Sequence, residues 1–125
     1  MSTSLAWFAV LGSVLLTVYG QLVIKWRVLA VHTGSFFETL VSVLKLFTDP
    51  WTLSAFVAAF GASICWMLAM TKLPLSLAYP FTSLAILIVT ISSIVMFQET
   101  VSISKWIGAA LVVAGLLVLF WGQGR

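Results

Sequence analysis

Four long apolar segments occupy most of this chain, at residues 5–24, 51–70, 77–97 and 106–121. An α-helix needs about 20 mostly apolar residues to cross the hydrocarbon core of a bilayer. Backbone N–H and C=O groups cannot stay unpaired in lipid, so such segments form helices rather than open sheets. The pattern therefore predicts an all-α membrane protein with four transmembrane helices.

The connections between the later segments are short. Residues 71–76 join the second segment to the third, and residues 98–105 join the third to the fourth. Short connections place neighbouring helices antiparallel. We expect an up-down bundle that forms a single transmembrane domain over residues 1–125.

The first connection, residues 25–50, is longer and has a pattern of its own. Polar residues recur at helical spacing, opposite a face rich in Phe, Leu and Val, at Glu38, Ser42, Lys45 and Asp49. This pattern predicts an amphipathic helix over about residues 35–47, lying in the membrane interface. The alternative is an extension of the second helix that stops at Pro50. His32 lies in this connection without metal-ligand spacing, and we expect it to be solvated.

Composition narrows the function further. Hydrophobic residues make up 62% of the chain and charged residues 7%, against about 25% charged residues in soluble proteins. The net charge of +3 suits anionic lipid headgroups, and no basic array indicates nucleic acid. There is no Gly-rich phosphate loop, no metal-spaced His/Cys set and no G-x-S-x-G, and the three carboxylates are scattered. We expect no catalysis, no metal and no cofactor.

Positive charges are distributed unequally between the two sides of the predicted bundle. The side of the first and third connections carries Lys25, Arg27, Lys45 and Lys105, whereas the other side carries Lys72, Arg125 and the amino terminus. The positive-inside rule favours the first and third connections in the cytoplasm.

Two predicted helices carry stripes of polar residues. The stripe on the first helix follows i, i+4, i+7, i+8, i+12 spacing and contains Ser13, Thr17, Gly20, Gln21 and Lys25. The stripe on the third helix contains Ser76, Tyr79, Ser83, Thr90 and Ser93. Two such stripes indicate a shared, water-accessible cavity. The alternative is that the hydroxyls bond their own backbone and that Gln21 bonds a neighbouring helix. We favour the alternative for the hydroxyls alone, and a binding site for Gln21 with Lys25.

Pro80 lies inside the predicted third helix and is expected to kink it. Proline removes one N–H and presses on the carbonyl of Ser76. Interrupted helices occur at transporter sites, although a packing kink is the alternative.

Lys25 and Glu99 end the first and third helices on the same side of the membrane. With Arg27 and Lys105 nearby, they predict a basic mouth that binds phosphate, held in shape by Glu99. The alternative is a structural ion pair with snorkelling cations.

The fourth helix carries a stripe of small residues. Gly108 and Gly115 are seven residues apart and lie on one face. Small residues let helix backbones approach closely, which predicts a dimer interface. The alternative is tight packing inside the monomer.

Three segments of the chain resemble a known family. LPLSLAYPFTSL at 73–84, FQETVS at 97–102 and WIG at 106–108 are similar to the drug/metabolite transporter superfamily in its four-helix branch, EamA-like or small multidrug resistance-like. Small multidrug resistance proteins form antiparallel dimers that exchange protons for cationic drugs. They share the Gly-x6-Gly spacing of the last helix, but they carry a membrane-embedded Glu where this chain has Thr17. Threonine cannot carry a proton in the same way, which argues against proton-coupled drug export.

The stronger resemblance is to the small flippase subunits for undecaprenyl-phosphate-aminoarabinose. Their Gly-Gln-Leu-x-x-Lys pattern is matched by GQLVIK at residues 20–25. This resemblance implies a flippase subunit for a polyprenyl-phosphate-linked sugar in the bacterial inner membrane, serving lipid A modification of lipopolysaccharide. It implies a homodimer, or a heterodimer with a similar subunit, and substrate-binding residues at Thr17, Gln21, Lys25, Arg27, Tyr79, Ser83 and Glu99. A multidrug-type exporter and a non-transporting membrane assembly factor are the alternative functions.

Overall fold

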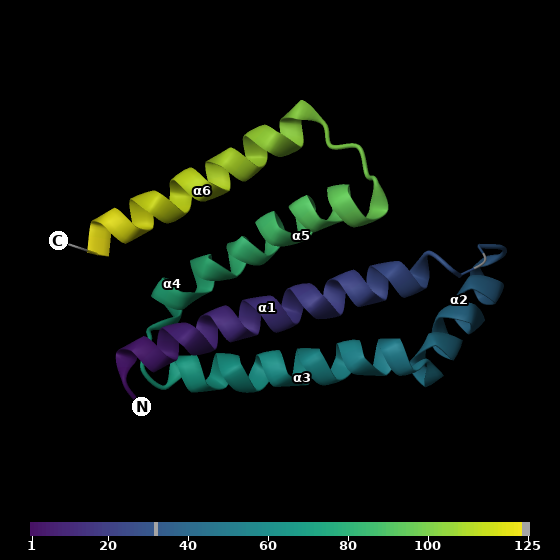
Figure 1. The fold of residues 1–125 in the computed structure, drawn as a ribbon, viewed down its shortest axis with the longest axis horizontal. Helices are drawn as coiled ribbons and strands as arrows, with labels where there is room; N and C mark the ends of the chain where they lie inside the picture. The colour runs from purple at the N-terminus through teal and green to yellow at the C-terminus, as the bar shows by residue number, and fades with distance from the viewer. Residues whose placement is uncertain (32, 124–125) are drawn as a thin grey trace.

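The computed structural model describes residues 1–31 and 33–123, so His32 and Arg125 lie outside the described residues. The helices are α1 (Thr3–Val28), α2 (Phe36–Lys45), α3 (Pro50–Met70), α4 (Leu75–Ala78), α5 (Ser83–Phe97) and α6 (Ile103–Gln123), as Figure 1 shows. Within the described residues, four helical spans are long and apolar enough to cross a membrane: α1, α3, α4 with α5, and α6. The predicted all-α class with four such helices is confirmed.

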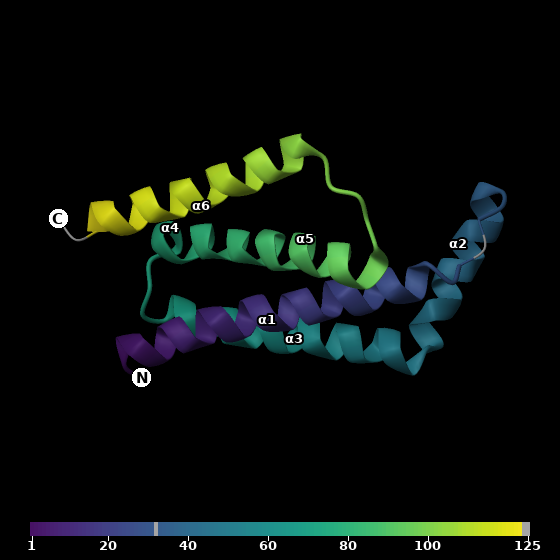
Figure 2. The same ribbon diagram turned by 45° about the horizontal axis from the view of Figure 1, so that its top comes forward.

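The spans run antiparallel to their neighbours along the chain. Figures 1 and 2 both show α1 beside α3, α5 along α1, and α6 beyond α5 at the edge of the molecule. The helix α2 leaves the bundle at the end where α1 finishes and α3 begins. The chain therefore goes up and down as the short connections predict.

The amphipathic segment forms a separate helix. Ser35 and Glu38 make a capping box, in which Ser35 Oγ accepts from the Glu38 N–H at 3.3 Å and the Ser35 N–H donates to Glu38 Oε2 at 2.9 Å. Phe36 and Phe37 are 85% and 71% exposed, so α2 presents an aromatic surface suited to the lipid interface.

Asp49 separates α2 from α3. Its backbone is extended, and its side chain accepts a hydrogen bond from the Thr52 N–H at 3.1 Å, while Pro50 occupies the first turn of α3. An extended N-cap residue followed by proline starts a new helix rather than continuing an old one. The alternative of one continuous second helix is therefore wrong.

Small residues line the contact between α1 and α3. The buried residues of α3 are Thr52, Ala55, Ala58, Ala62 and Ala69. A Cβ atom at Gly20 would lie 3.2 Å from the carbonyl oxygen of Ala55, which is tighter than ordinary contact. Tyr19 Oη and Ser54 Oγ are 3.0 Å apart and form a hydrogen bond between the two helices. Close backbones and interhelical hydrogen bonds are what hold helices together in lipid.

A second cluster of packed side chains lies at the end of the molecule where α1 begins. It contains Ala6, Val10, Ala69, Leu73, Ala78 and Phe81. The Phe81 ring meets Trp7 at 4.9 Å and Phe120 at 4.8 Å between centroids, both edge to face. This aromatic cluster ties the third and fourth spans to the start of α1.

The third span is interrupted by a short 3₁₀ turn, Tyr79–Thr82, that contains Pro80. Thr82 Oγ1 donates to the Tyr79 carbonyl at 2.6 Å, and Ser83 Oγ donates to the Pro80 carbonyl at 2.5 Å. Hydroxyl donors therefore satisfy carbonyls at the point where the regular helix is broken, as lipid surroundings require.

Most of α6 is exposed. Leu116 is its buried residue, and Phe120 joins the aromatic cluster near its carboxyl end. A Cβ atom built on Gly108 or Gly115 meets nothing within 4 Å among the described residues. The small-residue stripe does not pack inside the monomer.

We expect Gly20→Ala to destabilise the fold, because the added methyl must push α1 and α3 apart. Overpacking a close contact costs about 1 kcal/mol or more. Gly12→Ala is the matched control, since its methyl would make only ordinary contact, 3.6 Å from Cys65 Sγ. Thermal unfolding in detergent should show a lower midpoint for Gly20→Ala alone. Equal midpoints for both variants would contradict the close approach at Gly20.

Candidate functional site

The polar stripe of α1 faces open cavities on both of its sides. Ser13, Thr17 and Gln21 line a cavity of about 480 Å³ against α3 and another of about 460 Å³ against α5. Gln21 also lines a third cavity, of about 380 Å³, at the end of α1. One face of α1 thus provides polar groups along a path that reaches from mid-helix to the charged end.

The third cavity contains the charged residues. Lys25, Glu99 and Lys105 line it, together with Thr90 and Ser93 of α5. Lys25 Nζ lies 3.0 Å from Glu99 Oε1. The predicted juxtaposition of the ends of the first and third helices is therefore present. Two ammonium groups and one carboxylate leave an excess of one positive charge.

The end of α5 places Glu99. Gln98 adopts a left-handed conformation with φ 54°, which stops the helix, and its Nε2 donates to the Val95 carbonyl at 3.1 Å. The next residue, Glu99, then pairs with Lys25 of α1. The hydrogen bond from Lys25 and the charges of Lys25 and Lys105 outweigh partial burial, so the pKa of Glu99 lies below its usual value. Glu99 is therefore a carboxylate at neutral pH.

The hydroxyls of α5 bond their own helix. Thr90 Oγ1 donates to the Ile86 carbonyl at 2.7 Å, and Ser93 Oγ donates to the Thr90 carbonyl at 2.9 Å. These hydroxyls therefore follow the alternative favoured from the sequence, in which they bond the backbone of their own helix. Each oxygen can still accept a hydrogen bond from a ligand in the cavity.

Gln21 differs from these hydroxyls. Its side chain is exposed, and it makes no hydrogen bond to any residue in the described part of the chain. The alternative in which Gln21 holds two helices together is not what the structure shows. Its amide is instead open to all three cavities.

Arg27 is not brought to the cavity of Lys25. Its Nη2 pairs with Asp49 Oδ1 at 2.9 Å, and its guanidinium lies 5.3 Å from the centroid of the Trp26 ring. The Arg27 Nε is buried and has no hydrogen-bond partner among the described residues. Sequence reasoning missed the role of Asp49, although an Asp before Pro is itself a helix-start signal. It placed Lys105 near the basic mouth but not among the substrate-binding residues.

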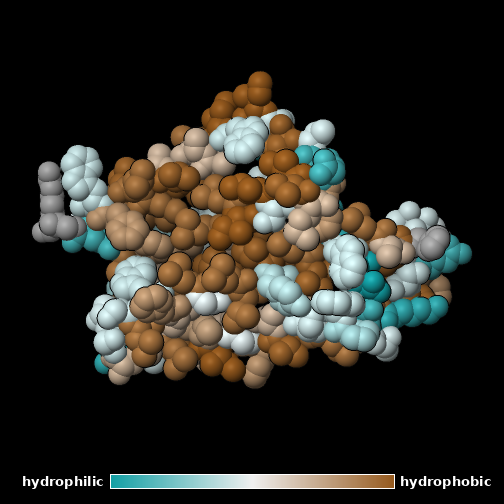
Figure 3. Space-filling view, viewed as in Figure 1, coloured by the Kyte–Doolittle hydropathy of each residue, from teal (hydrophilic) through white to brown (hydrophobic). Residues whose placement is uncertain are grey.

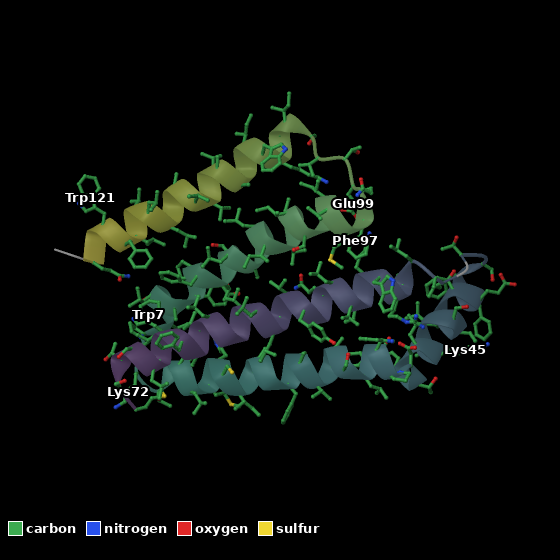
Figure 4. The ribbon with its side chains drawn as sticks, viewed as in Figure 1. Trp7, Lys45, Lys72, Phe97, Glu99 and Trp121 are labelled. Carbon is green, nitrogen blue, oxygen red and sulfur yellow. The ribbon has the colours of Figure 1, made fainter. Side chains whose placement is uncertain are left out.

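Tyr79 and Ser83 lie toward the other end of the molecule. The exposed Tyr79 ring meets Trp66 edge to face at 6.2 Å, and Trp66 lines the cavity between α1 and α3. Figure 4 shows the two ends apart, with Lys72 at one and Lys45, Phe97 and Glu99 at the other. The predicted set therefore divides into a charged end and an aromatic end.

The surface between these ends is apolar. Figure 3 shows brown, hydrophobic residues over most of this face, with hydrophilic residues gathered mainly at the end that carries α2. Four apolar spans around cavities lined by one polar stripe define a small multi-pass membrane protein of the transporter class. The chain belongs to the small multidrug resistance family, whose model, described as Small Multidrug Resistance protein, matches residues 25–112.

The family match begins at Lys25 and leaves the preceding part of α1 outside. That part contains Thr17, the position at which the sequence departs from the drug-exporting members.

Curated relatives carry a more specific name. The chain is 37% identical to the probable 4-amino-4-deoxy-L-arabinose-phosphoundecaprenol flippase subunit ArnF of Erwinia tasmaniensis, over 92% of this chain and 94% of that one. It is 35% identical to the corresponding ArnF of Pseudomonas aeruginosa, over 95% and 87%. A subunit named ArnE, from Aeromonas salmonicida, is 37% identical over 60% of this chain and 65% of its own length. No solved structure matches the chain significantly. The predicted resemblance is confirmed.

We expect Asp49→Asn to lower the thermal stability of the protein at about pH 7. Asparagine can still cap α3, but it cannot neutralise Arg27, which is mostly buried. Partial burial raises the pKa of Asp49, but the Thr52 hydrogen bonds and Arg27 outweigh it and hold the pKa below its ordinary 3.8.

A depressed pKa adds stability that is complete above the ordinary value and is lost as the pH falls through the folded-state value. The difference between wild type and Asp49→Asn should therefore shrink only below about pH 4. Unfolding midpoints of wild type and Asp49→Asn, measured from about pH 7 to below about pH 4, test this expectation. Glu38→Gln is the control, because it removes a different carboxylate. A difference that is independent of pH would show that the charge of Asp49 is not what stabilises this end.

Proposed function

We propose that this chain is a subunit of a flippase that moves a polyprenyl-phosphate-linked aminosugar across the bacterial inner membrane. The relatives named above supply the substrate class. The observation that carries the proposal is the placement of Gln21 and Lys25 on one face of α1, beside cavities that α1 shares with α5.

The charged end suits the headgroup. Lys25 and Lys105 present two ammonium groups to one cavity, and an ammonium group binds phosphate as a point charge. Gln21 adds an amide that can donate to a sugar hydroxyl or a phosphate oxygen. In this proposal Arg27 contributes to the positive field while its guanidinium stays with Asp49.

The remaining predicted residues suit a path for the headgroup. Thr17 lines the cavities on both sides of α1, so a polar headgroup passing along α1 would meet a hydroxyl at mid-helix. Tyr79 and Ser83 lie toward the far end, where the headgroup would leave. In this proposal the cavities open to the side, so the polyprenyl chain can stay in lipid. Pro80, in the 3₁₀ turn beside them, provides a bend at that end.

The family match favours a second candidate, a small multidrug resistance-type exporter of drugs or metabolites. Such exporters couple transport to a proton carried by a Glu in the first helix, and Thr17 has no titrating group. We therefore expect no proton-driven export of a cationic dye from liposomes, and robust dye–proton exchange would reverse the choice between the two functions.

Assembly with a second small subunit completes the proposal. The glycines of α6 face open space, and α6 lies at the edge of the four spans (Figure 2). Small residues support close helix contact in lipid. We propose that Gly108 and Gly115 pack against the same helix of a second copy or of a similar subunit.

We expect Lys25→Ala to weaken binding of a polyprenyl phosphate, because it removes the cation next to Gln21. Loss of one charge-assisted contact should cost about tenfold in affinity. Lys72→Ala, which removes a lysine at the opposite end, is the matched control. Native mass spectrometry of lipid binding to both variants measures the effect. Equal binding by Lys25→Ala and wild type would remove Lys25 from the site.

We expect the double variant Gly108→Leu with Gly115→Leu to shift a dimer toward monomer. Two bulky side chains would separate the paired helices, at a cost of roughly 1–3 kcal/mol. Cross-linking yield in detergent at low protein concentration measures the dimer fraction, and Ala110→Leu is the control, since Ala110 is an exposed small residue of α6 that lies about 200° around the helix from Gly108. An unchanged dimer fraction would place the partner surface on another helix.

A further inference from the structure

We propose that Glu99 binds a primary ammonium group on the lipid headgroup while Lys25 and Lys105 bind its phosphate. The inference rests on the proposed function and extends it, since it makes the cavity selective for headgroups that carry both charges. It follows from the geometry of the Lys25–Glu99 ion pair and from the ammonium group of Lys105, which lines the same cavity.

The ion pair is accessible. Lys25 and Glu99 are 3.0 Å apart, and their side chains are 47% and 38% exposed in the cavity they share. An ion pair in contact with solvent contributes little and exchanges partners easily. A headgroup entering the cavity can therefore separate the two side chains and bind each of them.

The arrangement of charges in the cavity suits a zwitterion. A phosphate alone could pair with Lys25 and Lys105, but it would leave Glu99 without its partner and close to a second negative charge. Like charges at such distances repel each other. A headgroup with a phosphate and an ammonium group gives Glu99 a new partner, so each charge of the headgroup meets an opposite charge, while the cavity keeps its excess of one positive charge.

The other two carboxylates of the chain do not have this freedom. Asp49 is held by Arg27 and Thr52, and Glu38 is held by the backbone of Ser35 in the capping box. Neither lines the cavity of Lys25. Glu99 is thus the carboxylate that a bound headgroup can reach.

Two lipids share the required chemistry, a phosphodiester with a primary ammonium. One is the polyprenyl-phosphate-linked 4-aminosugar of the proposed function, and the other is phosphatidylethanolamine. The test therefore uses four probes: the 4-aminosugar lipid, its N-acetylated counterpart, phosphatidylethanolamine and phosphatidylglycerol. N-acetylation removes the positive charge and retains the phosphate and the chain.

Affinities are measured on the full-length protein in detergent, for wild type, Glu99→Gln, Glu99→Asp and Asp49→Asn. Wild type should bind the amino form about tenfold more tightly than the N-acetylated form, the value of one charge-assisted contact. Glu99→Gln should bind the N-acetylated form at least as well as wild type does. The ratio of its affinities for the amino and N-acetylated forms should be close to one. Glu99→Asp and Asp49→Asn should keep the preference.

The outcomes separate the two proposals. Failure of wild type to bind either sugar lipid overturns the proposed function and the inference with it. Equal binding of both sugar lipids by wild type, or a preference that survives in Glu99→Gln, overturns the role of Glu99 alone. Binding of phosphatidylethanolamine as tight as that of the aminosugar, with phosphatidylglycerol weak, supports ammonium recognition but overturns the sugar lipid as the selected substrate. The comparison of the four lipids on the wild-type protein does not depend on the folding of any variant.

Discussion

The close approach of α1 and α3 is the contact on which the rest of the structure depends. Lipid gives helices no hydrophobic reason to associate, so they are held by fit and by hydrogen bonds. Gly20 lets the backbone of α1 come near the Ala55 carbonyl, and Tyr19 bonds Ser54 on the same side. Because small residues form this contact, the polar stripe of α1 lies at its edge and stays open to the cavities.

The charged residues at one end divide into two pairs with different roles. Arg27 and Asp49 tie the last turn of α1 to the first turn of α3, with the aromatic ring of Trp26 beside the guanidinium. Lys25 and Glu99 join α1 to the end of α5 across a cavity. The first pair is largely buried and stabilises the end of the bundle. The second is exposed and can exchange partners, so it is the pair suited to binding a ligand.

The monomer leaves one span without close neighbours. Apart from Leu116 and the aromatic contact of Phe120, α6 offers most of its length to its surroundings. Membership of the small multidrug resistance family and likeness to flippase subunits agree with a chain that is one part of a larger transporter.

The sequence alone determined the four spans, the amphipathic helix and the shared end of Lys25 and Glu99. Helices in lipid satisfy their backbone within each segment, so length and hydrophobicity are enough to predict them. Only the tertiary structure decided that Arg27 turns to Asp49, that Gly20 is a packing residue, that Tyr79 lies far from Lys25 and that α6 stands apart. These outcomes depend on the rotation of each helix about its axis and on distances between helices. Local periodicity sets neither the rotation of a helix nor its distance from its neighbours. Two charged residues on one turn, such as Lys25 and Arg27, can therefore face different partners.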